Sequence, residues 1–395
     1  MPLYAQHGHG KSDKISTAFE TGSIQGVVFG ARNEKPANLV PYVREIRDTL
    51  QAQLLFDPQF YVSTLIPPND RFLPEYPYYR PGRTAGDFVG ARRLSEYARQ
   101  TLDVQMGLDL DRLIAPSVLF NTFDDRWYQI ALNLADASLD YHAGLKDPPP
   151  LLLTFAFSEE ALDSRSEVDV FLDQVTSWDT KGFYLLIART EVGYSQYFDK
   201  DRLSQLLYLT LVLSIINGFE VVNGYADFCG LLTRAAGATA FATGWSQALR
   251  QFHRKSFVRQ TPGHRQPRLR YSSGPLFNSI LLTELEQISD VGGLGLVLSN
   301  VGLDKMIADA SSPEASDWNL RTSELHHWET LQSLEGKLSG DPSADFDRVV
   351  AWLKTANEIY VALKQAGVVF ERYTQGQHIP EWVEGIQLFR SAVSV

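Results

Sequence analysis

The sequence predicts an α/β protein: a (β/α)8 TIM-like barrel with an all-helical C-terminal extension. The first observation is that seven short apolar runs each precede a longer segment with helical spacing. The second is that these runs do not alternate between apolar and polar residues, as is typical of parallel strands covered on both faces. The third is that only helical patterns follow residue 275. Repeated βα units favour a barrel, with a doubly wound open sheet as the alternative.

Seven strands are expected, each followed by a helical segment. The first run is followed by Leu39, Val43, Ile46 and Leu50, which recur at helical spacing. We expect a helix over 245–255 after the seventh strand, and the eighth strand is either 267–273 or 293–300. The seven strands are expected at 25–30, 53–57, 112–120, 150–157, 182–189, 219–224 and 238–244.

Three amphipathic helices are expected in the C-terminal part, over 323–338, 345–367 and 380–393. The segment before the second contains helix start signals, and Gly367 is a plausible C-terminal stop. We therefore predict two domains, a barrel over 1–275 and a helical domain over 276–395. The helical domain is expected to pack on the barrel or to bind a partner protein.

Composition narrows the class of protein. The net charge of -11 argues against general coating of nucleic acid or anionic membrane, which favours basic surfaces. Cys229 is the single cysteine, so no internal disulfide and no thiolate zinc cluster is expected. The histidines are scattered, and we predict no metal site and no cofactor. The chain contains no apolar run long enough to span a membrane, and we expect a reducing cytoplasm.

Polar residues follow most of the expected strands, and in a barrel these positions gather at one mouth. Carboxylates and amides there suit a flat, polar heterocycle such as a purine-like base or a nucleotide. Asp57 and Asp227 are the candidate catalytic residues, although each is also placed to cap a helix or to complement its dipole. The candidate substrate-binding residues are Gln59, Asn121, Arg189, Glu191, Asn223, Trp245 and Gln247.

A segment without acidic residues extends from 228 to 283. In so acidic a chain, this separation of basic from acidic residues indicates a local positive surface. Such a surface would contact phosphate, a nucleic-acid backbone or an acidic partner, and the 250–270 part is the candidate interface. A solvated helix face is the alternative. The candidate phosphate or nucleic-acid contacts are Arg250, Arg254, Lys255 and Arg259.

Two stretches resemble the tRNA-guanine transglycosylase superfamily, whose barrels exchange guanine for a 7-deazaguanine base in RNA or, in relatives, DNA. They are "LLFDPQF" at 54–60 and "VVNGYADFCGLLTRAAGATAFATGWSQALR" at 221–250. The resemblance implies that Asp57 is an acid/base near the exchanged base. It also suggests a place among DNA-modification or phage-defence relatives.

The chain departs from this family in two respects. Ala242 occupies the approximate position of the family's aspartate nucleophile, and alanine has no nucleophilic atom. The family's zinc site of three cysteines and one histidine is missing. Either the nucleophile has moved, to Asp227 or Glu191, or the barrel binds a base or nucleotide without transglycosylation.

Three functions remain open. The first is a nucleobase- or nucleotide-handling barrel of the transglycosylase type, a glycosyltransferase if it is active. The second is a non-catalytic protein that binds a partner through a degenerate barrel. The third is an unrelated hydrolase that pairs Asp57 with Glu159 or Glu191.

Overall fold

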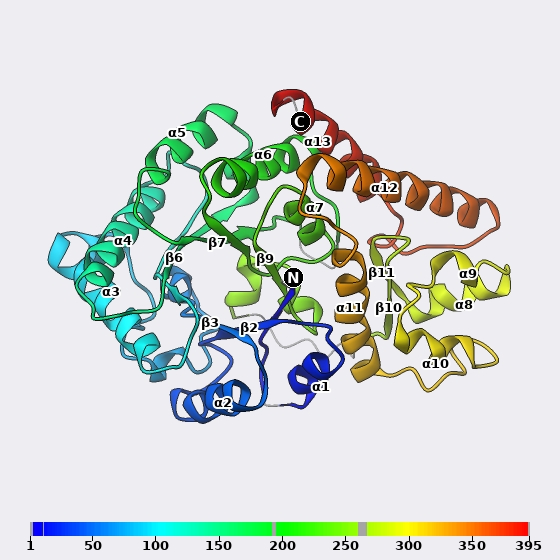
Figure 1. The fold of residues 1–395 in the computed structure, drawn as a ribbon, viewed down its shortest axis with the longest axis horizontal. Coiled ribbons are helices and arrows are strands. Elements are labelled where there is room, and N and C mark those ends of the chain that lie inside the picture. Colours follow the sequence, from blue (N-terminus) through cyan, green and yellow to red (C-terminus); the bar gives the residue numbers. More distant parts are fainter. Residues whose placement is uncertain (1–2, 11, 192–194, 260–266, 394–395) are drawn as a thin grey trace.

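Parallel strands form a nearly closed barrel of eight strand positions at the centre of the molecule (Figure 1). A computed structural model describes residues 3–10, 12–191, 195–259 and 267–393. The hydrogen-bonded order is β3-β2-β1-β9-β8-β7-β6-β4, and β5 also pairs with β6, so β4 and β5 share one position. The strands are β1 (Leu3–Gln6), β2 (Gly26–Gly30), β3 (Gln53–Asp57), β4 (Leu113–Ile114), β5 (Leu119–Phe120), β6 (Leu151–Ser158), β7 (Gly182–Ala188), β8 (Glu220–Asn223) and β9 (Ala240–Thr243).

The eighth strand was expected at the wrong place, because β1 fills the eighth strand position, between β2 and β9. Its four residues pair with β2 on one side and with β9 on the other. The run is too short to give a strand signal, and its last residue, Gln6, is polar. Of the two segments proposed instead, 267–273 contains a strand of a separate antiparallel hairpin, and 293–300 contains a short helix.

The strand expected over 112–120 is divided into β4 and β5. Pro116 lies between them and has no backbone N–H to donate to a ladder. The paired part of this segment is therefore short, whereas the neighbouring β6 is buried along its full length.

Asp111 joins the two edges of the barrel between β3 and β4. Its backbone N–H donates to the carbonyl of Leu54 (2.9 Å), and its carboxylate accepts the backbone N–H of Leu54 (2.7 Å). The guanidinium of Arg47 donates to the same carboxylate (2.8 Å). These contacts take the place of a strand ladder among the described residues at this edge.

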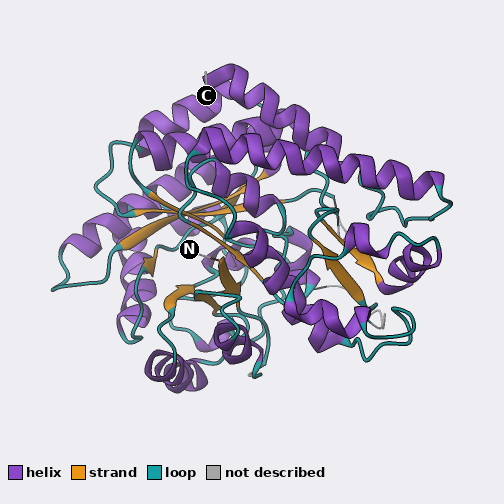
Figure 2. Ribbon diagram, turned by 45° about the vertical axis from the view of Figure 1, so that its right-hand side comes forward, coloured by secondary structure: helices purple, strands orange, loops and turns teal. Residues whose placement is uncertain are grey.

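Helices cover the outside of the barrel (Figure 2). Several of them begin at a side-chain cap. Asp125 accepts the backbone N–H of Trp127 at the start of α4 (3.0 Å), and Asp199 caps α6 in the same way. Pro36 occupies the first turn of α2. The helices along the barrel are α1 (Lys14–Glu20), α2 (Pro36–Thr49), α3 (Ala91–Met106), α4 (Arg126–Ala143), α5 (Arg165–Val175), α6 (Lys200–Leu211) and α7 (Cys229–Ala235).

The helix expected over 245–255 does not form. This part of the chain contains two short 3-10 turns, Gln247–Leu249 and Arg254–Phe257. It crosses the mouth of the barrel instead, because Phe252 and Phe257 are buried there against aromatic side chains of the mouth.

Helix α11 (Leu320–Glu335) completes the outer ring in place of that missing helix. It packs on β1, α1 and α7 and lies between the barrel and the hairpin (Figure 1). The fully buried Trp328 indole donates to the carbonyl of Thr243 at the end of β9 (2.9 Å). Lys14 of α1 forms an ion pair with Glu324 of α11 (2.7 Å).

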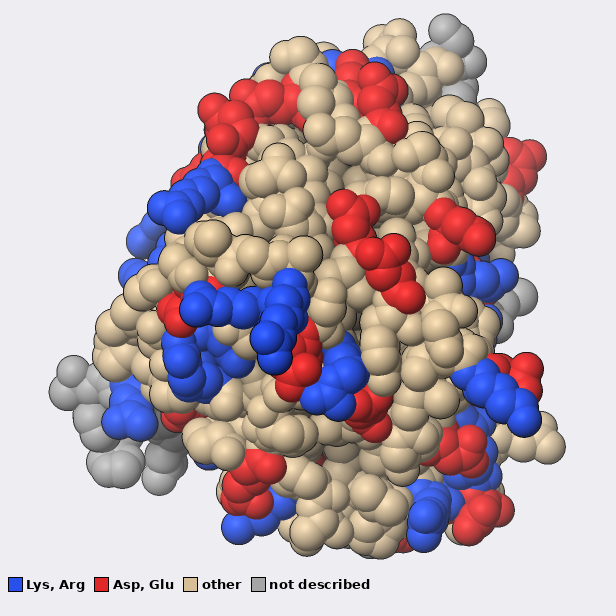
Figure 3. All heavy atoms as spheres, turned by 90° about the vertical axis from the view of Figure 1, so that its left-hand side faces the viewer, with Lys and Arg blue, Asp and Glu red and all other residues tan. Residues whose placement is uncertain are grey.

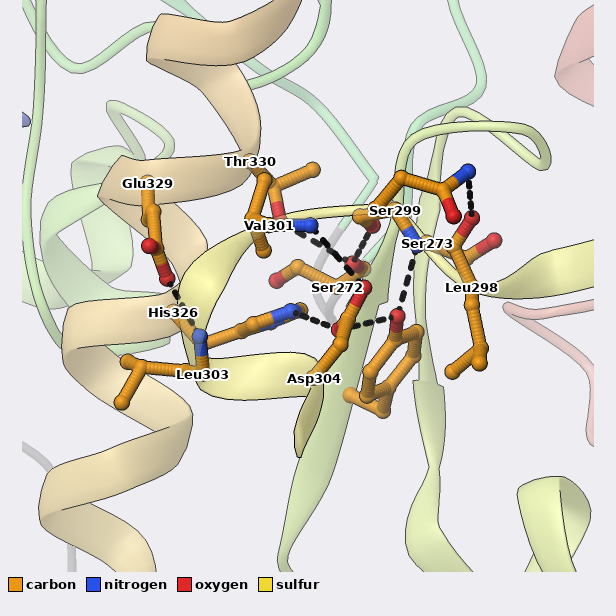
Figure 4. Close-up of polar contacts among 12 residues, drawn as sticks. Ser272, Ser273, Leu298, Ser299, Val301, Leu303, Asp304, His326, Glu329 and Thr330 are labelled. Atoms are coloured by element: carbon orange, nitrogen blue, oxygen red, sulfur yellow. Dashed lines mark hydrogen bonds and ion pairs between the residues drawn. The ribbon is translucent and has the colours of Figure 1, made fainter. Parts of the chain in front are cut away.

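A two-stranded hairpin, β10 (Arg270–Ser273) and β11 (Asn278–Leu281), lies apart from the barrel strands (Figure 2). It is followed by α8 (Leu282–Asp290), α9 (Leu294–Val297) and α10 (Lys305–Ala308). The carboxylate of Asp304 accepts hydrogen bonds from Tyr271 (2.7 Å) and His326 (2.9 Å). It thereby joins the hairpin to α11 (Figure 4). The proposed domain boundary at 275/276 falls in the turn of this hairpin.

Helices α12 (Pro342–Gln365) and α13 (His378–Val393) pack on α7 and α6, respectively, and on each other. The approach is close at Gly385 of α13, where an added Cβ would lie 2.9 Å from the carbonyl oxygen of Lys200. Within the described ranges, no helix combines the length and the apolar character that crossing a membrane requires.

We expect Asp111→Ala to lower the free energy of unfolding by about 1–3 kcal/mol, because it leaves the backbone N–H of Leu54 without its carboxylate acceptor. Urea denaturation followed by circular dichroism measures this change. The control is Asp109→Ala, whose carboxylate contacts the same Arg47 (3.4 Å) from an exposed position and should change stability by less than about 0.5 kcal/mol. Equal effects of the two changes would contradict the role of Asp111 at the barrel edge.

Candidate functional site

Asp57 ends β3 inside the barrel, where it is 1% exposed. Its carboxylate accepts the backbone N–H of Gln59 (2.9 Å) and the hydroxyl of Tyr61 (3.0 Å). Burial raises the pKa of Asp57 to about 7, although the hydrogen bonds from Gln59, Tyr61 and Tyr184 oppose the shift. Asp57 is therefore a buried acid whose proton is held near neutral pH, and it caps no α-helix.

The mouth plug, which we define as residues 251–258, covers this acid. Phe252 and Phe257 pack on Tyr61 with ring centroids 5.1 and 5.4 Å apart. Tyr225 contacts the same two phenylalanines. Because Tyr61 itself donates to Asp57, the plug and Tyr61 separate the carboxylate from solvent.

Backbone contacts hold the mouth plug in place. The N–H of Arg189 donates to the carbonyl of Phe252 (2.8 Å), and the N–H of Asn69 donates to that of Phe257 (2.8 Å). The guanidinium of Arg32 donates to the carbonyl of Ser256 (2.6 Å) and lies over the ring of Phe257. The plug is thus anchored to loops that follow β2, β3 and β7.

Both ends of the Gln59 amide are already bonded within the protein. Its oxygen accepts the backbone N–H of Arg32 (2.7 Å), and its nitrogen donates to the hydroxyl of Tyr225 (2.8 Å). The residue has a left-handed backbone (φ 50°). Gln59 therefore ties together the loops after β2, β3 and β8, and its predicted contact with a base would have to use the second N–H or the second lone pair of the amide.

Asp227 lies beside the buried His327, which in turn contacts Ser272. Its carboxylate accepts from Gln196 (2.9 Å) and lies 3.4 Å from Nε2 of His327. Nδ1 of His327 lies 2.9 Å from the hydroxyl of Ser272. Burial lowers the pKa of His327 well below its usual value, so the imidazole is neutral.

The order Ser272, His327, Asp227 is similar to that of a hydrolase triad, but the ring nitrogens are exchanged, because Nδ1 faces the serine and Nε2 faces the aspartate. However, Ser272 is buried, with 2% of its surface exposed. A substrate therefore cannot reach this hydroxyl in the present conformation. These contacts instead connect the hairpin and α11 to the wall of the barrel.

The other predicted contacts are dispersed around the mouth. The guanidinium of Arg189 is bonded to Glu159 (2.6 Å), and Arg372 is bonded to Glu191 (3.1 Å). The three carboxylates of the hydrolase alternative, Asp57, Glu159 and Glu191, thus have separate partners.

Three further predicted contacts lie apart from these carboxylates. Asn121 donates to Asp125 (3.3 Å). Trp245 packs on His7 and Trp328, and Gln247 is exposed.

Three cations of the acid-free segment pair with acids from elsewhere in the chain. Arg234 pairs with Glu335, Arg259 with Asp70, and Arg268 with Glu371. Arg250 is buried and donates to the carbonyls of Gly244 and Trp245. Arg265 lies outside the described residues. Positive and negative side chains are similarly interleaved on the face drawn in Figure 3.

The mouth cleft is an open cavity of about 230 Å³ at the carboxyl ends of β5, β6 and β7. It brings together four predicted residues, two for substrate (Asn121, Arg189) and two for phosphate (Arg254, Lys255). Arg254 and Lys255 are both exposed. Its lining comprises Leu119, Asn121, Ser158, Glu160, Ala188, Arg189, Thr190, His253, Arg254 and Lys255.

Four polar residues of the mouth cleft were not among the predicted contacts: Ser158, Glu160, Thr190 and His253. Glu160 and Thr190 lie two residues after their strands, just beyond the positions that we took as the strand ends. His253 belongs to the segment that was expected to be a helix. Burial lowers the pKa of His253, and its ring nitrogens lie 3.1 Å from the oxygens of Arg189 and Gln251.

The inner chamber is a smaller cavity, of about 40 Å³, at the carboxyl ends of β7 and β8. Asn223, Asp227 and Arg250 line it, together with Cys229 and apolar side chains of β7 and α6. Burial raises the pKa of the Cys229 thiol to about 11, so it is protonated near neutral pH. Among the described residues, no group of three or more histidine, cysteine or acidic side chains is placed to hold a metal ion.

Two solved structures are distantly similar to this chain. No protein-family model matches the chain, and no curated protein matches it. A 3-dehydroquinate dehydratase from Enterococcus faecalis aligns with a TM-score of 0.34 and 10% identity, over 63% of this chain and 90% of the dehydratase. A dihydrodipicolinate synthase from Oceanobacillus iheyensis aligns with a TM-score of 0.24 and 10% identity, over 96% and 100% of the two chains.

No family model matches the chain, so the resemblance to the tRNA-guanine transglycosylase superfamily stays a hypothesis. The fold rests on the strand pairing of the chain itself, which is that of a nearly closed TIM-like barrel with a helical C-terminal region.

We expect Asp57→Asn to stabilise the protein above pH 7. The pKa of Asp57 is about 7 when folded, against an ordinary value of 3.8, so above pH 7 folding must bury an ionised carboxylate. That cost is fully present above pH 7, decreases as pH falls towards 3.8 and is absent below it. The asparagine removes up to about 4 kcal/mol of it.

Urea denaturation of both proteins at pH 8 and pH 5 measures the effect. The stability difference in favour of Asp57→Asn should be largest at pH 8 and smaller at pH 5. Asp163→Asn, which alters an exposed carboxylate paired with Arg202 (2.6 Å), should show no such gain at pH 8. A variant that is less stable than the parent at pH 8 would show that the ionised Asp57 is well solvated or well paired.

Proposed function

We propose that this protein binds a nucleotide or a similar phosphate ester in the mouth cleft. The observation that carries the proposal is the exposed pair Arg254–Lys255 on one wall of a cavity at the carboxyl ends of the barrel strands. Binding sites of TIM barrels are found at this end of the strands. Among the described residues, the guanidinium of Arg254 has no hydrogen-bond acceptor of its own, so it is available to a ligand.

The two walls of the mouth cleft differ in their chemistry. Arg254 and Lys255 would bind phosphate oxygens, the guanidinium in a bidentate manner. Asn121, Ser158 and Thr190 line the other wall; the two hydroxyls already donate to Glu160 and Glu159, so they offer acceptor lone pairs, which suit the hydroxyl groups of a sugar. The volume is below the usual range of roughly 300–1,000 Å³ for ligand pockets, so we expect a small ligand that remains partly in solvent.

We propose binding rather than base exchange, although the resemblance to the transglycosylases suggests a purine-like or 7-deazaguanine base. The acid that the resemblance implies, Asp57, is covered by the mouth plug, and Ala242 has no nucleophilic atom. A base in the mouth cleft would lie outside this plug. Transglycosylation would therefore require both an opening of the plug and a nucleophile from elsewhere.

A mononucleotide fits the charge of the protein better than a nucleic-acid chain does. The net charge is -11, and Arg259 and Arg268 of the 250–270 segment pair with Asp70 and Glu371. Few cations on this side thus remain for a long phosphate backbone, whose affinity grows with the number of phosphates contacted.

We expect the double change Arg254→Gln, Lys255→Gln to weaken binding of guanosine monophosphate at least about tenfold, since it removes both cationic contacts to the phosphate. Binding of guanosine, which has no phosphate, should change little. Isothermal titration calorimetry at low and moderate salt measures both ligands, and the affinity of the parent for the monophosphate should fall as salt rises.

The matched control is Arg268→Gln, which removes a cation of the same acid-free segment that is paired with Glu371, away from the mouth cleft. It should leave nucleotide binding unchanged. The proposal fails if the parent protein binds no nucleotide, or if the double variant binds the monophosphate as tightly as the parent.

A further inference from the structure

We propose that the inner chamber is a second binding site, for a primary amide or ureido group of a small neutral molecule, with Asn223 as the residue that recognises it. This site is distinct from the mouth cleft and its proposed nucleotide. Arg189 borders both cavities, whereas Asn223 lines only the inner chamber.

The first observation is the state of the Asn223 side chain. The residue is 2% exposed, yet neither its amide nitrogen nor its amide oxygen has a hydrogen-bond partner among the described residues. An unpaired buried polar group costs about 1–3 kcal/mol, and Asn223 presents both a donor and an acceptor to the inner chamber. A ligand that satisfies both at once must offer an acceptor beside a donor in one plane, as an amide does.

The second observation is the balance of charge around the inner chamber. Asp227 and Arg250 line it with opposite charges, and the guanidinium of Arg189, which also lines it, is already paired with Glu159 (2.6 Å). A carboxylate ligand would meet the buried Asp227, and an ammonium ligand would meet the buried Arg250. Since an unpaired charge is costly to bury, a neutral polar group is favoured.

The third observation is size. A water molecule needs roughly 10–15 Å³ of such space, so a chamber of about 40 Å³ accommodates about three groups of that size. A primary amide has three non-hydrogen atoms and fits, whereas a purine ring does not. Ile187, Phe198 and Leu206 supply an apolar wall for the carbon that carries the amide.

The test uses acetamide as the probe and the full-length protein. Titration followed by methyl NMR at Ile187 and Leu206 should show saturable shifts with a Kd on the order of 1 mM, the range expected for so few atoms. Sodium acetate, which has the same shape and a negative charge, should give no saturable shift at these methyl groups. Absence of saturable binding of acetamide to the parent protein would overturn the proposal.

Asn223→Leu should weaken acetamide binding at least tenfold, because leucine is similar in size and has neither a donor nor an acceptor. The matched control is Thr233→Val, since the Thr233 hydroxyl lines the same chamber but already donates to the carbonyl of Gly230 (3.0 Å), and this variant should bind acetamide normally. Asn223→Ser, which keeps one hydroxyl, provides a smaller change if the leucine variant does not fold and should also bind more weakly. Equal binding by the Asn223 variants and the parent would show that Asn223 does not recognise the amide.

The outcome is independent of the nucleotide proposal. Asn223→Leu should leave the affinity for guanosine monophosphate unchanged, and Arg254→Gln, Lys255→Gln should leave the affinity for acetamide unchanged. Loss of nucleotide binding in the Asn223 variant would show that the two cavities form one site and would contradict their separation.

Discussion

The burial of Phe252 and Phe257 against Tyr61 and Tyr225 determines where a ligand can bind to this barrel. Aromatic pairs at these separations add to the free energy gained by removing the rings from water. Because these rings lie across the mouth of the barrel, they cover Asp57 at the end of β3. The accessible polar groups are therefore displaced to the rim, where the mouth cleft opens beside the plug.

The mouth plug also explains the unusual route of the chain after β9. A regular barrel would place a helix directly after this strand, but the residues that would form it lie across the mouth. The chain then forms the hairpin and α8 to α10 before α11 returns to the barrel. Trp328 and the contacts of His327 with Ser272 and Asp227 fix that return. The helical C-terminal part is thus partly a component of the barrel, since α11 fills the outer position between α7 and α1.

The sequence predicted the repeated units well and the irregular parts poorly, for physical reasons. Long apolar runs such as β6 are recognisable because parallel strands are buried on both faces. The four residues of β1 carry no such signal, and their place depends on pairing with β2 and β9. The 245–255 segment has a helical pattern, but the burial of its phenylalanines in the mouth overrides that local preference.

In the candidate site, too, positions along the chain could be predicted from the sequence, whereas contacts between distant segments could not. Asn121, Arg189, Arg254 and Lys255 were predicted from their positions after strands or in the acid-free segment, and they line one cavity. The hydrogen bonds of the Gln59 amide with Arg32 and Tyr225 could not be predicted, because they form only where three loops meet in space. The same is true of the unpaired amide of Asn223, which only the packing of β7, β8 and their helices reveals.

The proton of Asp57 and the position of the mouth plug are linked by thermodynamics. The pKa of Asp57 is near 7 because burial disfavours its ionised form. Any movement of the plug that admitted water would lower this pKa towards its ordinary value and release a proton. Raising the pH therefore weakens the closed form relative to such an open form, and lowering it strengthens the closed form. The aromatic contacts of the plug must exceed this cost for the barrel to remain closed above neutral pH.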